Sequence, residues 1–119
     1  IKVKIVGVRE DPQFGPFMVL GLGGIYVEAL KDVAFRLLPV SEEDAGEMLD
    51  ELRAKALLGA FRGAKARDRQ ALMTAAAGLS ALYLEYRDAL SDLEINPLIV
   101  LAEGEGVRAV DVRPVRRTT

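Results

Sequence analysis

Histidine and cysteine are both absent from the 119-residue chain, and these absences limit its chemistry. Without histidine, no imidazole can serve as a general base, a metal ligand or a phosphoryl carrier. Without cysteine, disulfides and thiolate zinc sites are excluded. Any catalytic or binding role of this chain therefore rests on carboxylates, amides, Lys, Arg or backbone groups.

Long apolar runs and an excess of positive charge are also missing. No run approaches about 18 apolar residues, so the sequence predicts no membrane-spanning helix. Residues 1–9 alternate in polarity and lack the apolar segment of a signal peptide. The net charge is −2, which does not favour nucleic acid binding. We expect a cytoplasmic protein, because the chain has neither a signal peptide pattern nor cysteine.

The composition is that of one globular domain, which we expect to cover residues 1–119. Half of the residues are hydrophobic and 29% are charged, enough to form a single core. The chain begins with Ile rather than Met, and we expect it to be part of a longer polypeptide.

Hydrophobic spacing predicts strands near both ends of the chain. Apolar residues alternate in residues 1–8, and a Pro- and Gly-rich segment at 11–16 ends that strand. Further strands are expected at 17–20, 32–39, 92–101 and 107–113, the last two joined as a hairpin.

Two helices are expected between these groups of strands. Ser41 can cap the first helix through the N–H of Asp44. Its apolar positions continue to Ala56, and Gly59 follows its end. Asp68 begins the second helix, whose expected buried stripe is Leu72, Ala75, Ala76, Leu79, Tyr83, Tyr86 and Leu90. The order predicts an α+β fold, a mostly antiparallel sheet covered on one face by two helices.

The predicted hairpin brings an amide and a carboxylate together. An even loop, either Glu103-Gly104 or residues 102–105, places Asn96 opposite Asp111, with their side chains on one face. Glu94 shares that face and lies opposite Arg113. The full predicted face reads Glu94, Asn96, Leu98 and Val100 against Val107, Ala109, Asp111 and Arg113. A three-residue loop would instead place Asn96 opposite Val112.

Oxygen ligands on an open sheet face suit Mg²⁺, which takes one or two ligands from protein and the rest from water and phosphate. The alternative from pairing alone is a solvated strand end that carries a Glu94–Arg113 ion pair.

Several segments, taken in order, resemble a known family. They are the residues at 11–16 (DPQFGP), 21–28 (GLGGIYVE), 30–37 (LKDVAFRL), 57–63 (LLGAFRG) and 93–98 (LEINPL), followed by Asp111. Together they are similar to the ATP-grasp region of ADP-forming acetyl-CoA synthetases. The same region resembles the β subunit of succinyl-CoA synthetase and the ATP-grasp part of some bacterial protein lysine acetyltransferases.

The resemblance implies a C-terminal ATP-grasp subdomain that binds ATP or ADP with Mg²⁺. Members of the family convert acyl-CoA, ADP and phosphate into carboxylate, CoA and ATP through a phosphohistidine. By matching the family's motif, Asn96 and Asp111 become the expected metal ligands, and Glu94 belongs to the same motif as a third candidate.

Four further residues are candidates for binding the nucleotide: Gly23, Gly24, Glu28 and Arg62. The glycines are typical of the family but fit neither the Walker nor the dinucleotide pattern. A tight turn therefore explains them equally well, and Arg62 is by default a solvated loop residue.

The resemblance also implies partners, because the family's N-terminal ATP-grasp subdomain and CoA-binding domain or subunit are not in this sequence. We therefore expect the chain to be part of a ligase and not to be catalytic alone. Oligomerisation stays open. The alternative is a regulatory or interaction module fused to a protein lysine acetyltransferase.

Overall fold

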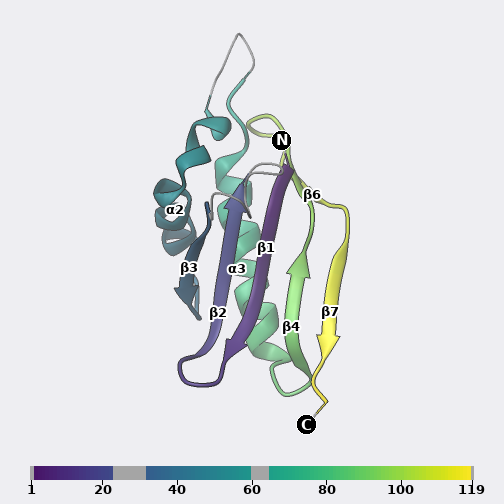
Figure 1. Ribbon diagram of the computed structural model, residues 1–119. Helices are drawn as coiled ribbons and strands as arrows, with labels where there is room; N and C mark the ends of the chain where they lie inside the picture. The colour runs from purple at the N-terminus through teal and green to yellow at the C-terminus, as the bar shows by residue number, and fades with distance from the viewer. Residues whose placement is uncertain (1, 23–31, 60–64, 119) are drawn as a thin grey trace.

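The computed structural model describes residues 2–22, 32–59 and 65–118. Within these residues, strands form one sheet in the order β3-β2-β1-β4-β7, and β5 extends it by pairing with β1 and β6. Every described strand pair is antiparallel. Two helices lie behind the sheet, and its other face is uncovered (Figure 1). The predicted α+β class is confirmed.

The first three strands form one side of the sheet. β1 (Lys2–Asp11) and β2 (Gly15–Leu22) are joined by a tight turn, and β3 (Ala34–Leu37) pairs with β2 at the edge. In the turn, Asp11 accepts hydrogen bonds from the backbone N–H groups of Gln13 and Phe14 at 2.8 and 2.9 Å. Gly15 completes the turn at a φ of 89°, which glycine adopts without strain.

Helix α2 (Glu42–Glu51) begins as the sequence predicts. The hydroxyl of Ser41 accepts from the N–H of Asp44, and the Asp44 carboxylate accepts from the N–H of Ser41. The helix ends earlier than predicted, because Leu52 is extended and a 3₁₀ helix, η1 (Arg53–Leu58), follows. Ala56 is therefore exposed, and its predicted place on the buried face is wrong.

Helix α3 (Arg69–Glu85) begins at Asp68, as predicted. Its buried residues are Leu72, Ala76, Leu79, Ser80 and Tyr83, and Ala75 is partly buried against the core. The prediction of the buried stripe is wrong for two residues. Tyr86 follows the end of the helix and is 52% exposed, while Leu90 belongs to the next strand.

The core lies between the helices and one face of the sheet. Strand residues that point to the helices include Val6, Val8, Met18, Leu20 and Leu93, and helix residues that meet them include Met48, Leu49, Leu72 and Tyr83. None of the described helices has the length and apolar content needed to cross a bilayer.

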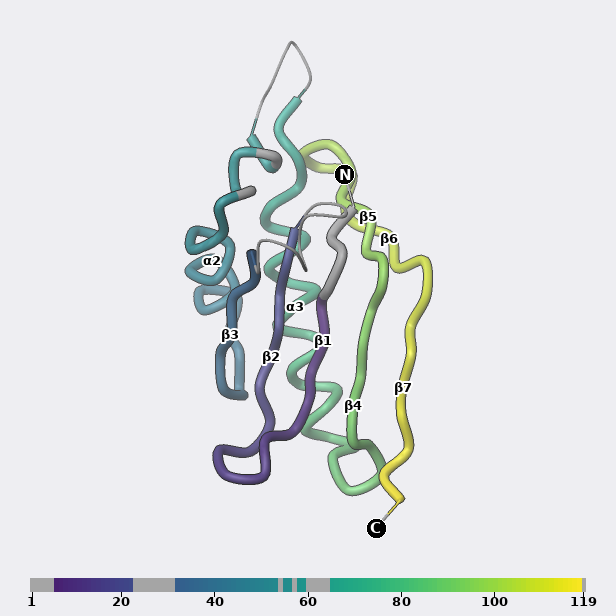
Figure 2. The backbone as a smooth tube through the Cα atoms, viewed as in Figure 1, coloured from purple at the N-terminus to yellow at the C-terminus, as the bar shows by residue number. Residues whose placement is uncertain are grey.

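Each strand predicted for the C-terminal hairpin is divided in two. The first gives β4 (Leu90–Ile95) and β5 (Leu98–Val100), and the second gives β6 (Val107–Ala109) and β7 (Val112–Arg116). β5 and β6 continue the lines of β4 and β7 toward one end of the sheet (Figure 2).

The buried side of this hairpin changes around the Asn96–Pro97 peptide. Leu93 is buried before it, whereas Leu98 and Val100 are buried after it, so the inward positions change from odd to even. The prediction that Leu98 and Val100 share the open face with Asn96 is therefore wrong.

Candidate metal and nucleotide site

The register of the hairpin agrees with the even-loop prediction. Glu94 pairs with Arg113 and Ile95 with Val112, while Leu98 pairs with Ala109 beyond the break. Between these pairs, the N–H of Asn96 donates to the carbonyl oxygen of Asp111 at 3.0 Å. Asn96 and Asp111 therefore lie opposite each other on neighbouring chain segments.

Asn96 and Glu94 point to the same face of the sheet. The side-chain amide of Asn96 donates through Nδ2 to Oε1 of Glu94 at 3.2 Å. This bond uses the amide nitrogen and leaves Oδ1 of Asn96 as an acceptor. In this arrangement, Oδ1 is the ligand atom that Asn96 can offer to a metal ion.

Asp111 provides the second oxygen donor. It is exposed, and among the described residues no hydrogen bond or ion pair to its carboxylate is found. The described part of the chain holds no group of three or more acidic, histidine or cysteine side chains that could bind a metal ion. The donor set is thus one amide and one carboxylate oxygen, which fits Mg²⁺ if water and phosphate complete its coordination.

Four charged residues surround a shallow depression on the same open face. Arg9 pairs with Asp92 in the β1–β4 register, and Glu94 pairs with Arg113 in the β4–β7 register. Together with Val115, these residues line a depression of about 330 Å³. Asn96 directly follows β4 and Asp111 directly precedes β7, so the candidate pair lies next to the strands that line the depression.

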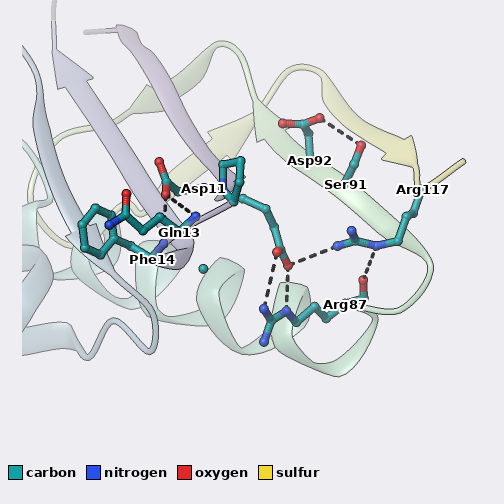
Figure 3. Close-up of a pocket in the computed structure, with 10 residues that line it drawn as sticks. Asp11, Gln13, Phe14, Arg87, Ser91, Asp92 and Arg117 are labelled. Carbon is teal, nitrogen blue, oxygen red and sulfur yellow. Dashed lines mark hydrogen bonds and ion pairs between the residues drawn. The ribbon is translucent and has the colours of Figure 1, made fainter. Parts of the chain in front are cut away.

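A larger pocket of about 700 Å³ lies at the β1–β2 turn, but its charged groups bind one another (Figure 3). Glu10 accepts from Tyr83 Oη at 3.0 Å, from Arg87 Nε at 2.7 Å and from Arg117 Nη2 at 3.1 Å. The bond from Arg87 is the main reason that the pKa of Glu10 falls below its usual value. Burial raises the pKa of Tyr83 to about 12. This cluster fastens α3 and the C-terminal segment to β1.

The other half of the open face is apolar, and sequence analysis missed it. Phe35 and Leu37 are each 55% exposed, and the rings of Phe17 and Phe35 lie 6.1 Å apart between centroids. With Phe14 they border a second depression of about 380 Å³. The alternation of Phe35 and Leu37 indicated a strand, but not that its apolar side would face away from the helices.

The four predicted nucleotide-binding residues, Gly23, Gly24, Glu28 and Arg62, lie outside the residues that the structure describes. Their role in nucleotide binding stays a prediction.

An antiparallel sheet with one open face, backed by two helices, defines an α+β subdomain. The chain belongs to the ATP-grasp domain family, which it matches over residues 3–115.

Within that family, the chain is similar to ADP-forming acyl-CoA ligases. It is 42% identical over 109 residues to the β subunit of ADP-forming acetate–CoA ligase II from Pyrococcus furiosus. It is 40% identical over 112 residues to ADP-forming 4-hydroxybutyrate–CoA ligase from Nitrosopumilus maritimus. These matches cover 92% and 94% of this chain, but only 46% and 16% of the two relatives.

A solved structure shares the fold. The dinucleotide-forming acetyl-coenzyme A synthetase 1 of Ca. Korarchaeum cryptofilum, in complex with coenzyme A and Mg-AMPPCP, aligns with a TM-score of 0.85 at 38% identity. The alignment covers 97% of this chain and 53% of the synthetase chain.

Proposed function

We propose that this chain is the Mg²⁺–nucleotide-binding half of an ADP-forming acyl-CoA synthetase. The reaction converts acyl-CoA, ADP and phosphate into carboxylate, CoA and ATP. Because the chain has no histidine, the phosphohistidine of this reaction is carried elsewhere. The main-chain pairing that places exposed Asn96 opposite exposed Asp111 is the observation that carries the proposal.

Asn96 and Asp111 hold the metal ion in this proposal. Oδ1 of Asn96 and the carboxylate of Asp111 are hard oxygen donors, and both residues are exposed to an approaching polyphosphate. When bound, Mg²⁺ neutralises phosphate charge during phosphoryl transfer. Glu94, a third candidate ligand from the sequence, accepts from the Asn96 amide and so orients it.

The remaining parts of the proposal follow from the resemblance of the sequence to the family. An N-terminal ATP-grasp subdomain and a CoA-binding domain or subunit complete the enzyme, and Gly23, Gly24, Glu28 and Arg62 contact the nucleotide. The cytoplasmic location also stays a prediction. The acetyltransferase module is not favoured, because the relatives described above are acyl-CoA ligases.

Calorimetric titration of ADP into the full-length native protein, with and without Mg²⁺, tests the proposal. We expect Asp111→Ala to remove most of the gain in ADP affinity that Mg²⁺ provides. Glu105→Ala removes a carboxylate from the turn of the same hairpin and should leave that gain unchanged. Equal Mg²⁺ dependence in the wild type and Asp111→Ala would contradict the metal role.

A further inference from the structure

Two guanidinium groups on the open face have no acidic partner in the described part of the chain. The four ion pairs found there involve Arg36, Arg69, Arg87 and Arg117. Arg9 and Arg113 take part in none of them, although each lies beside a carboxylate in the sheet register, Asp92 and Glu94 respectively. Both arginines line the depression of about 330 Å³.

The position of Arg113 relative to the candidate metal ligands is limited by the chain itself. Arg113 lies in β7 and follows Asp111 by two residues, so the Cα atoms of the two residues are at most about 7 Å apart. The outstretched side chain of arginine covers a similar length. A polyphosphate that shares one phosphate with an ion at Asp111 can therefore present its next phosphate to the Arg113 guanidinium.

Gly7 adds no side chain to the open face beside Glu94. It lies between Val19 and Glu94 in the sheet register, and a Cβ built there would meet Cβ and Cγ of Glu94 at 3.6 Å. With hydrogen in that place, the surface beside Glu94 stays open for a group that comes from above the sheet.

We propose that Arg113, assisted by Arg9, binds the terminal phosphate of the nucleotide, so that the site distinguishes a nucleoside diphosphate from a monophosphate. The inference rests on the proposed function and adds a specificity residue to it. The planar guanidinium can donate two parallel hydrogen bonds to phosphate oxygens, which lysine cannot do.

The metal ion and Arg113 act together in this arrangement. Asp92 and Glu94 offset the charges of the two arginines, so the depression has little attraction for phosphate until a divalent ion adds positive charge at Asn96 and Asp111. The contribution of Arg113 to nucleotide affinity should consequently be much larger with Mg²⁺ than without it.

Calorimetric titration of ADP and AMP into the full-length native protein, with Mg²⁺ present, tests this inference. We expect Arg113→Gln to weaken ADP binding by about 10- to 100-fold, the usual worth of a charged hydrogen-bond pair. AMP binding should change by less than about twofold, because AMP has no second phosphate. Arg113→Lys should restore part of the ADP affinity.

Arg116→Gln is the matched control, since it removes the same charge from the same strand on the opposite face and should change neither affinity. Equal losses for ADP and AMP, or unchanged ADP binding, would overturn the role of Arg113 and leave the proposed function standing. If Arg113→Gln does not fold, the ratio of ADP to AMP affinity in Arg113→Lys decides in the same way. An unsubstituted protein that binds no Mg²⁺–nucleotide would overturn both proposals.

Discussion

At the residue scale, Asp68 joins two elements that are distant in sequence. Oδ1 accepts from the N–H of Ala71 in the first turn of α3 at 3.1 Å. Oδ2 accepts from the N–H groups of Gly104 and Gly106 in the β5–β6 turn, at 3.1 and 2.8 Å. Both glycines have positive φ, which lets their N–H groups turn toward the carboxylate. A helix cap thus also fixes the hairpin turn.

Because of these hydrogen bonds, we expect the contribution of Asp68 to the stability of the fold to depend on pH. The N–H of Ala71, followed by that of Gly106, lowers the folded pKa of Asp68 below its ordinary value of 3.8. Its stabilisation is therefore present above that ordinary value and is lost as the pH falls through the folded pKa. Asp68→Asn should lower the urea midpoint at pH 7 and have a smaller effect near pH 2.

Urea denaturation at both pH values, with Glu85→Gln as an exposed control, checks this prediction. A loss of stability in Asp68→Asn that is the same at both pH values would contradict it.

Glu10 has a comparable role at the opposite end of the sheet, where two arginines and Tyr83 converge on it. We expect Glu10→Gln to lower the free energy of unfolding at pH 7 by about 1–2 kcal/mol, because it weakens bonds between charged groups that are only partly exposed. Guanidinium chloride would mask ionic effects, so urea denaturation is the suitable measurement. A change below about 0.3 kcal/mol would show that the cluster adds nothing to stability.

At the scale of single elements, the beginning of α2 could be predicted because its signal is local. Ser41 and Asp44 form both bonds of a capping box within one helical turn. The end of α2 could not be predicted, because the apolar spacing continues through Leu52 although the backbone there is extended. The stop depends on packing, since Leu52 is fully buried against the core.

The cap gives a prediction for α2. Ser41→Ala should lower the free energy of unfolding by about 1 kcal/mol, because the N–H of Asp44 loses its acceptor, whereas Ser41→Gly should cost only a few tenths. Chemical denaturation of both variants at pH 7 separates the two values. Equal effects for Ala and Gly would show that the hydroxyl bond does not stabilise the helix.

The opposition of Asn96 and Asp111 was predictable for a similar reason. A hairpin register is a local property, and an even turn between β5 and β6 was sufficient to align Asn96 with Asp111. Which face of the hairpin is buried could not be predicted, because the buried face changes at Asn96–Pro97 while the register between the strands stays the same. Sequence alternation alone cannot detect such a change.

At the scale of the whole molecule, the two faces of the sheet differ in what their apolar residues contribute. Leu20 faces the helices and is fully buried, whereas Leu37 is 55% exposed on the open face. Leu20→Ala should cost about 3 kcal/mol of stability, and Leu37→Ala less than about 1 kcal/mol. Denaturant titration of the two variants provides the comparison, and similar losses would mean that the open face is covered in solution.

A second prediction at this scale concerns activity. The purified chain should form no ATP from acetyl-CoA, ADP and phosphate, because it has no histidine to carry the phosphoryl group. A coupled assay for ATP measures this directly. Measurable turnover by these residues alone would contradict the proposal that the phosphohistidine lies elsewhere.

The strand that follows Asp111 has consequences for ligand binding. β7 lies at the edge of the sheet and pairs only with β4 among the described strands, and Pro114 in its middle has no N–H to offer a further strand. Such a border opens easily, so its amides should exchange with solvent sooner than those of β1. An ion shared by Asn96 and Asp111 would hold the start of β7 against the end of β4 and slow that exchange. Nucleotide binding can then be followed as slower amide hydrogen exchange in this edge strand.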